Sequence, residues 1–130
     1  MIFLDTSAIY ALADTTDQNH DKAVRLFTKA SKEGEELFLH NYILIEATAL
    51  IQRRLGLHLA KTFLKDSSKF TVLWIDASLH EKSVQSFHQS SQRKLSFVDW
   101  VSFLAMREKG VAAAFAFDED FRKAGFRLYQ

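Results

Sequence analysis

Short apolar runs, each closed by an acidic residue, alternate with amphipathic helical segments along this 130-residue chain. Residues 2–4 are apolar and end at Asp5, and the apolar run 111–117 ends at Asp118. Segments such as 20–33 instead carry apolar residues at helical spacing, and the sequence contains no proline to interrupt them. Strands that alternate with helices predict an α/β fold, namely a three-layer α/β/α sandwich with a mostly parallel central sheet.

Three local patterns predict where helices begin. Asn41 is a suitable N-cap for a helix that Gly56 ends, and residues 78–81 and 96–99 each have the form of a capping box. The chain also has 12 phenylalanines and two tryptophans, Trp74 and Trp100. Their spacing predicts packing in the core rather than stacking on nucleobases.

Composition narrows the class of protein. The length predicts one domain over residues 1–130, and the absence of cysteine excludes disulfides, thiol nucleophiles and cysteine-type zinc sites. The four glycines stand singly, so neither a Walker loop nor a dinucleotide fingerprint can form. No apolar run is long enough to cross a membrane and no signal peptide is evident, which predicts a soluble, cytoplasmic protein.

Four single acids lie in otherwise apolar surroundings: Asp5, Glu46, Asp99 and Asp118. An unpaired buried carboxylate is costly, and convergence on a cation would remove that cost from all four. In a parallel sheet the carboxyl ends of strands and the first turns of helices share one edge, so we expect the acids to meet in one crevice. Each acid alone could instead be a helix cap, a turn residue or an ion-pair partner.

The ligand type predicts the metal. An all-carboxylate site favours Mg²⁺ or Mn²⁺ over Zn²⁺. The five histidines show no metal-binding spacing, and we interpret them as structural or surface residues; they are His20, His40, His58, His80 and His88. The net charge is only +1, but four basic residues lie close in sequence to the acids and are candidates for phosphate contact: Arg93, Lys94, Arg122 and Lys123.

The ordered set of motifs resembles the PIN-domain nucleases, and most closely the VapC-type toxins of toxin–antitoxin pairs. The matching segments are Phe3-Leu4-Asp5-Thr6-Ser7, Glu46 in its apolar helix, Leu95-Ser96-Phe97-Val98-Asp99, and Phe117-Asp118-Glu119-Asp120-Phe121. The resemblance implies Mg²⁺- or Mn²⁺-dependent endoribonuclease activity, a homodimer, and inhibition by a small antitoxin protein. It also implies that Asp5, Glu46, Asp99 and Asp118 are the catalytic and metal-binding acids.

Other positions follow from the same resemblance. Thr6, Ser7 and Ser96 are expected to line the site, and Asp120 is a possible extra metal ligand. Two residues depart from the usual pattern: Ala116 stands where Thr or Ser is common, and Trp100 stands where a small residue is usual. Neither departure removes a carboxylate, so activity is still expected.

Other functions stay open from the sequence alone. Cation-assisted hydrolysis of a phosphodiester does not need the RNA 2′-hydroxyl, so the acids do not distinguish RNA from DNA. A PIN nuclease that processes RNA without being a toxin, or an acid-pocket binding module without activity, fits the same residues. A receiver domain or a phosphatase with an aspartate nucleophile fits less well, because Asp5 is followed by Thr6-Ser7 and not by a second acid.

Overall fold

The computed structural model describes all residues 1–130 and contains one sheet of five parallel strands in the order β3-β2-β1-β4-β5. The strands are β1 (Ile2–Leu4), β2 (Leu37–His40), β3 (Thr71–Leu73), β4 (Ala113–Phe115) and β5 (Arg127–Leu128). The predicted α/β class and parallel sheet are confirmed.

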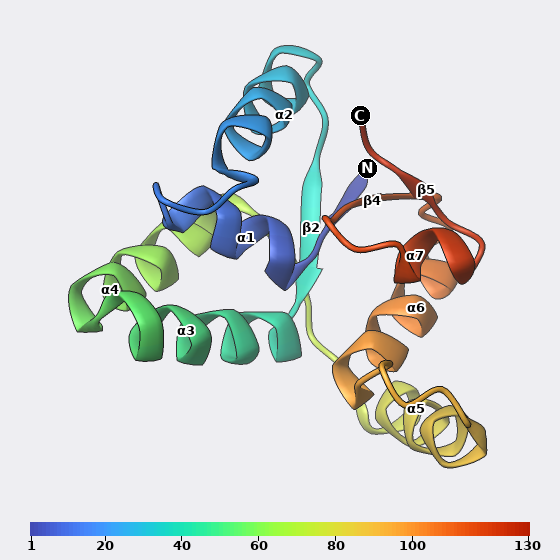
Figure 1. Ribbon diagram of the computed structural model, residues 1–130. Coiled ribbons are helices and arrows are strands. Elements are labelled where there is room, and N and C mark those ends of the chain that lie inside the picture. The colour runs from blue at the N-terminus through green and yellow to red at the C-terminus, as the bar shows by residue number, and fades with distance from the viewer.

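Seven α-helices cover the sheet in two layers. They are α1 (Thr6–Ala13), α2 (His20–Lys32), α3 (Asn41–Leu55), α4 (Leu57–Asp66), α5 (Ala77–Gln89), α6 (Phe97–Lys109) and α7 (Asp120–Lys123), with a 3₁₀ turn at Ser67–Lys69. Figure 1 shows α1 to α4 on one side of the strands and α5 to α7 on the other. None of these helices has the length and apolarity needed to span a bilayer.

The strand order reverses between β1 and β4. The chain runs from β1 outward to β2 and β3, then returns through α5 and α6 to place β4 on the free side of β1. Phe3 pairs with Ala114 and Leu4 with Phe115 across this junction. In parallel sheets, ligands bind beyond the carboxyl ends of the strands at such a reversal, so this edge positions the candidate site.

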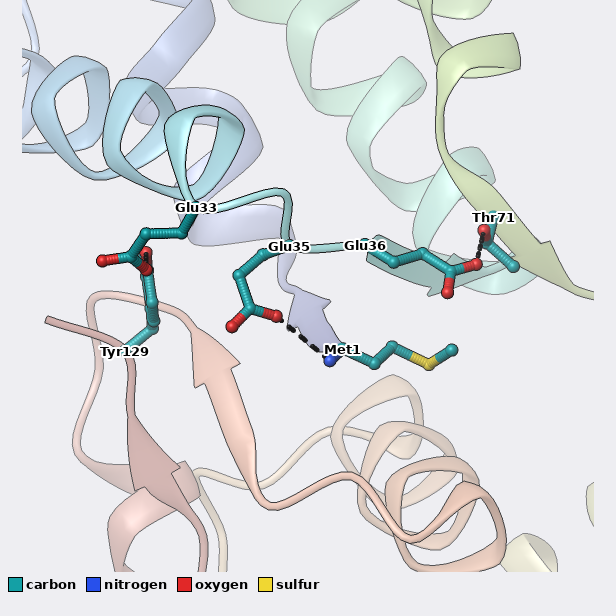
Figure 2. Close-up of polar contacts among 6 residues, drawn as sticks. All are labelled: Met1, Glu33, Glu35, Glu36, Thr71 and Tyr129. Atoms are coloured by element: carbon teal, nitrogen blue, oxygen red, sulfur yellow. Dashed lines mark hydrogen bonds and ion pairs between the residues drawn. The ribbon is translucent and has the colours of Figure 1, made fainter.

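The connection from α2 to β2 is held by three glutamates (Figure 2). Glu33 accepts a hydrogen bond of 2.9 Å from the hydroxyl of Tyr129, and Glu35 pairs with the Met1 amine at 3.1 Å. Glu36 accepts a hydrogen bond from the Thr71 hydroxyl at the start of β3. These contacts tie together the starts of β1, β2 and β3, which lie at the opposite edge of the sheet from the carboxyl ends.

Two of the three predicted N-caps are wrong. His40 caps α3, because its Nδ1 accepts the Ile43 N–H, whereas the Asn41 side chain accepts the N–H of Ile75 at 2.7 Å. Helix α5 is capped by Asp76 and not by a box over 78–81. The box at 96–99 is confirmed, with both of its reciprocal hydrogen bonds present.

The core is built from the strands and the helix faces turned toward them, including Phe3, Phe38 and Phe115. Trp74 departs from the predicted core packing, because 70% of it is exposed just beyond the edge strand β3. Along α3 the buried residues are Ile43, Ala47 and Ile51. Other large apolar side chains, notably Ile45 and Leu64, are also exposed.

Candidate active site

Asp5 is the most buried acid of the predicted set and directly follows β1. Its backbone N–H continues the sheet by donating to the Phe115 carbonyl at 3.1 Å, so Asp5 lies at the junction with β4. As the N-cap of α1, its Oδ2 accepts hydrogen bonds from the Ser7 amide at 3.1 Å and the Ser7 hydroxyl at 2.6 Å. Its other oxygen, Oδ1, makes no hydrogen bond.

The Ser7 hydroxyl joins the two central strands. It donates to Asp5 and accepts the backbone N–H of Phe117 at 3.0 Å. The first bond fixes the rotamer of the carboxylate, and the second fixes the start of the loop that leads from β4 to Asp118. Ser7 therefore sets the position of two predicted site acids at once.

The acids at this edge act on one another electrostatically. Burial raises the pKa of Asp5 to about 7; the charges of Asp118 and Asp99 contribute in the same direction, and the hydrogen bonds from Ser7 oppose it. Burial also raises the pKa of Asp99 and of Asp118, and Asp120 raises both further. The charges of Asp99 and Asp118 thus act on Asp5, and that of Asp120 acts on Asp99 and Asp118, so the ionised forms of these acids destabilise one another.

Each of the three acids is held by one oxygen only. Asp99 Oδ2 accepts the Ser96 N–H at 2.9 Å inside the capping box, and Asp118 Oδ1 accepts the Asp120 N–H at 3.1 Å. As at Asp5, the second oxygen of each carboxylate has no hydrogen-bond partner. Local backbone groups therefore orient these side chains while leaving one oxygen of each free for a ligand.

Glu46 is placed differently from the other three. It lies in the second turn of α3, half-buried, between the buried residues Ile43 and Ala47. It makes no hydrogen bond or ion pair, and the carboxylate charges that chiefly raise the pKa of Asp5 are those of Asp118 and Asp99. The alternative that Glu46 is an ion-pair partner within its own helix does not hold, since Arg53 and Arg54 form no ion pair.

The donor set matches the chemistry of a hard divalent cation. All the groups are carboxylate oxygens, burial and like charge raise the pKa values of Asp5, Asp99 and Asp118, and no lysine or arginine forms an ion pair with these three. In this conformation no three acidic or histidine side chains are close enough together to hold a metal ion. The residues therefore fit Mg²⁺ or Mn²⁺ in type and in charge, and a coordination shell would require their free oxygens to draw closer.

The remaining predicted side chains lie in different surroundings. The Thr6 hydroxyl is buried without a hydrogen-bond partner, whereas Ser96 is exposed and serves as the N-cap of α6. Arg93 and Lys94 are exposed in the loop before α6. Each of these is one to six residues from a site acid in sequence.

The two cations after Asp118 differ in their contacts. Arg122 is engaged by Glu119, with Nη1 to Oε2 at 2.9 Å, so its charge is already partly neutralised. Lys123 forms no ion pair and lines a cavity together with Asp120. Of this pair, only Lys123 is free to meet an anionic ligand.

A buried link between α3 and α6 was missed by sequence reasoning. His40 is fully buried, and its Nε2 lies 2.9 Å from the Ser102 hydroxyl, which donates to the Val98 carbonyl. Because Nδ1 accepts the Ile43 N–H, the proton is assigned to Nε2. This chain of hydrogen bonds fixes the start of α3 against the first turns of α6, beside Asp99. Single polar residues in the apolar segments around His40 and Ser102 were the available signal.

The parallel α/β fold and the acids that follow its central strands are typical of the PIN-domain nucleases, and the comparison with family models identifies the same family. Residues 2–127 match the model of the PIN domain family, so the chain belongs to the PIN-domain family.

The curated relatives are more specific. The chain is 38% identical over 128 residues to a protein named 23S rRNA-specific endonuclease VapC20, from two strains of Mycobacterium tuberculosis. The match covers 97% of this chain and 95% of the relative. The crystal structure of Mycobacterium tuberculosis VapC20, described as a sarcin–ricin loop cleaving toxin, superposes with a TM-score of 0.87 at 34% identity. That superposition covers 97% of this chain and 96% of the other.

Proposed function

We propose that this chain is an endoribonuclease that hydrolyses phosphodiester bonds of 23S ribosomal RNA, requires Mg²⁺ or Mn²⁺, and is the toxin of a toxin–antitoxin pair. The observation that carries the proposal is the 38% identity to the VapC20 endonuclease over 97% of the chain. The electrostatic coupling of Asp5 to Asp99 and Asp118 supports it, because Asp5 follows β1 and ligands bind beyond the carboxyl ends of the strands in this type of sheet.

The roles of the residues follow from their contacts. Asp5, Asp99 and Asp118 would bind the cation through the oxygens that make no hydrogen bond, while Ser7 and Ser96 hold the other oxygens of Asp5 and Asp99 in place. Glu46 would complete the set from α3. A bound divalent cation lowers the pKa of a water molecule and neutralises charge that develops on the phosphate. Lys123 would contact the RNA backbone, since it forms no ion pair.

Cleavage of purified ribosomal RNA tests the activity. The wild-type chain is incubated with 23S rRNA and with a DNA of the same sequence, in Mg²⁺, Mn²⁺ or chelator, and the ends are mapped by primer extension. We expect discrete, cation-dependent cuts in the RNA only. Asp5→Asn should reduce the rate by at least about a hundredfold, because it removes the charge of the most buried ligand.

A matched control separates this effect from a general loss of charge. Asp66→Asn removes an exposed carboxylate at the end of α4 and should cut at the wild-type rate. Equal activity of wild type and Asp5→Asn would contradict the proposed site. Cuts in other RNAs but not in 23S rRNA would favour an RNA-processing PIN nuclease, and no cation-dependent cutting would favour a binding module without activity.

The proposed toxin role requires an antitoxin protein. Toxin and antitoxin genes are expected to be adjacent, so a short reading frame next to this gene should encode a protein that co-purifies with the chain and stops cleavage. A missing reading frame, or a product that leaves cleavage unchanged, would contradict the toxin role while leaving the nuclease intact.

We further propose a homodimer that uses the exposed apolar side chains on and beside α3. Ile45 and Trp74 are 67% and 70% exposed, Leu64 is 49% exposed, and together they line one hollow of about 410 Å³. A second copy seated there would cover these side chains and place the two Glu46 residues near the interface. Light scattering at micromolar concentration should give twice the monomer mass; a monomer would contradict this part.

A further inference from the structure

A cavity lies between α6, α7 and the loop before α6. It has a volume of about 300 Å³, and its lining includes Gln92, Trp100, Arg107, Asp120 and Lys123. Asp120 links this cavity to the acids of the proposed active site. It lines the cavity, and its charge raises the pKa of Asp99 and of Asp118. A ligand in this cavity would therefore lie next to the proposed site of cleavage.

The aromatic wall of the cavity is Trp100, which follows Asp99 directly in α6. Its ring is braced edge-to-face by Phe103, with ring centroids 5.8 Å apart. The indole N–H is buried and has no hydrogen-bond partner. A small rotation of the ring toward an acceptor in the cavity would therefore break no existing hydrogen bond and would remove an unfavourable buried polar group.

The charged side chains that line the cavity can bind a phosphate and can hydrogen-bond to a nucleobase. Lys123 forms no ion pair. Arg107 is held by the Ala124 carbonyl at 3.2 Å and by the ring of Phe126, which fixes its guanidinium without neutralising it. Asp120 offers a carboxylate acceptor in the lining of the same cavity.

We propose that this cavity is a nucleotide-binding subsite that holds one ribonucleotide of the RNA strand next to the cleaved phosphodiester. The base stacks on Trp100, and the phosphate lies between Lys123 and Arg107. The size agrees, because 300 Å³ is at the lower end of the range of ligand pockets and fits one nucleotide rather than a duplex. Aromatic stacking and backbone contacts of this kind are how proteins bind single-stranded RNA.

This proposal rests on the proposed function for its RNA substrate, so the first test measures binding without cleavage. The chain has two tryptophans, and in a Trp74→Phe background Trp100 is the only indole. In chelator, each of the four ribonucleoside 5′-monophosphates is titrated to millimolar concentration while the Trp100 emission is followed. We expect saturable quenching by at least one of them, with affinity about tenfold weaker in Lys123→Ala.

A matched lysine provides the control. Lys61→Ala removes an exposed lysine of α4 and should bind as the Trp74→Phe parent does. Emission that no nucleotide changes, or equal binding by Lys123→Ala and Lys61→Ala, would overturn the subsite.

The second test uses RNA cleavage. Lys123→Ala should raise KM about tenfold with little change in kcat, and Trp100→Leu should alter the base preference at one position beside the cut in a randomised RNA. An unchanged KM and an unchanged base preference in an active enzyme would overturn the subsite but not the nuclease. Nucleotide binding in chelator by a chain that never cuts RNA would instead contradict the nuclease and leave the subsite standing.

Discussion

Asp5→Asn should stabilise the cation-free protein at neutral and alkaline pH, although it removes a residue of the proposed active site. Burial and the charges of Asp118 and Asp99 raise the pKa of Asp5 from 3.8 to about 7. A raised carboxyl pKa means that the folded state binds a proton more readily than the unfolded state. The contribution of this carboxyl to the free energy of unfolding is therefore fully present below about pH 4 and is lost as the pH rises through 7. The pKa shift corresponds to roughly 4 kcal/mol of unfolding free energy, which the wild type loses at alkaline pH. Asn carries no charge and avoids this loss, while its side-chain oxygen can still accept a hydrogen bond from Ser7.

Urea and thermal unfolding of the two proteins in chelator measure this difference in stability directly. Above about pH 8 the variant should be more stable by up to about 4 kcal/mol, and its Tm higher by about 10 °C, whereas below about pH 4 the two should agree. Mn²⁺ should stabilise the wild type and leave the variant unchanged, since ligand binding adds to stability only where the site exists. Asp66→Asn, at an exposed carboxylate, should stay within about 0.5 kcal/mol of wild type at every pH. A variant less stable than wild type at pH 8, or a difference that does not vary with pH, would refute the reasoning.

Three further changes test other parts of the structure. Ser7→Ala removes the hydroxyl between Asp5 and the Phe117 amide, so urea unfolding should show a loss of about 1–3 kcal/mol; an unchanged midpoint would mean that the link is not made in solution. Burial lowers the pKa of His40 from 6.5 to about 3, so stability should fall as the pH drops from 6.5 toward 3. The His40→Gln variant should lack the part of this loss that is due to His40, which is up to about 5 kcal/mol of unfolding free energy. A pH profile identical to that of the wild type would contradict the lowered pKa of His40. Ile45→Asp places a charge on the proposed dimer surface and should convert the dimer to monomer by light scattering, without loss of helical circular dichroism.

The order of strands and helices could be predicted because it depends on local patterns. The run over residues 2–4 ends at Asp5 as expected, and the capping box at Ser96 forms as its residues indicate. The start of α3 could not be read in the same way. Asn41 is the better local cap, but its side chain is used by the Ile75 amide from a neighbouring segment, and buried His40 takes over the capping. A long-range hydrogen bond thus overrides a local preference.

Burial was predicted well for the strands and less well for helix faces. A strand between two helical layers is buried on both sides, so its apolar residues can only be core, as Phe3 and Phe115 are. An apolar helix residue can face its own sheet or the surface. Ile45 and Trp74 are of residue types that are usual in a core, yet both are largely exposed to solvent. Sequence periodicity does not distinguish these cases, because a surface that another molecule covers has the same composition as a core.

The acids show the same division between backbone and side chain. Asp5 and Asp118 follow neighbouring strands and Asp99 lies in a first helical turn, so the backbone alone brings them together once the sheet is parallel. Glu46 depends instead on the rotation of α3 and on a longer, freer side chain. The pattern of lone acids therefore identifies the elements that carry the site, whereas the position of the fourth acid depends on how α3 packs and on the rotamer of a long side chain.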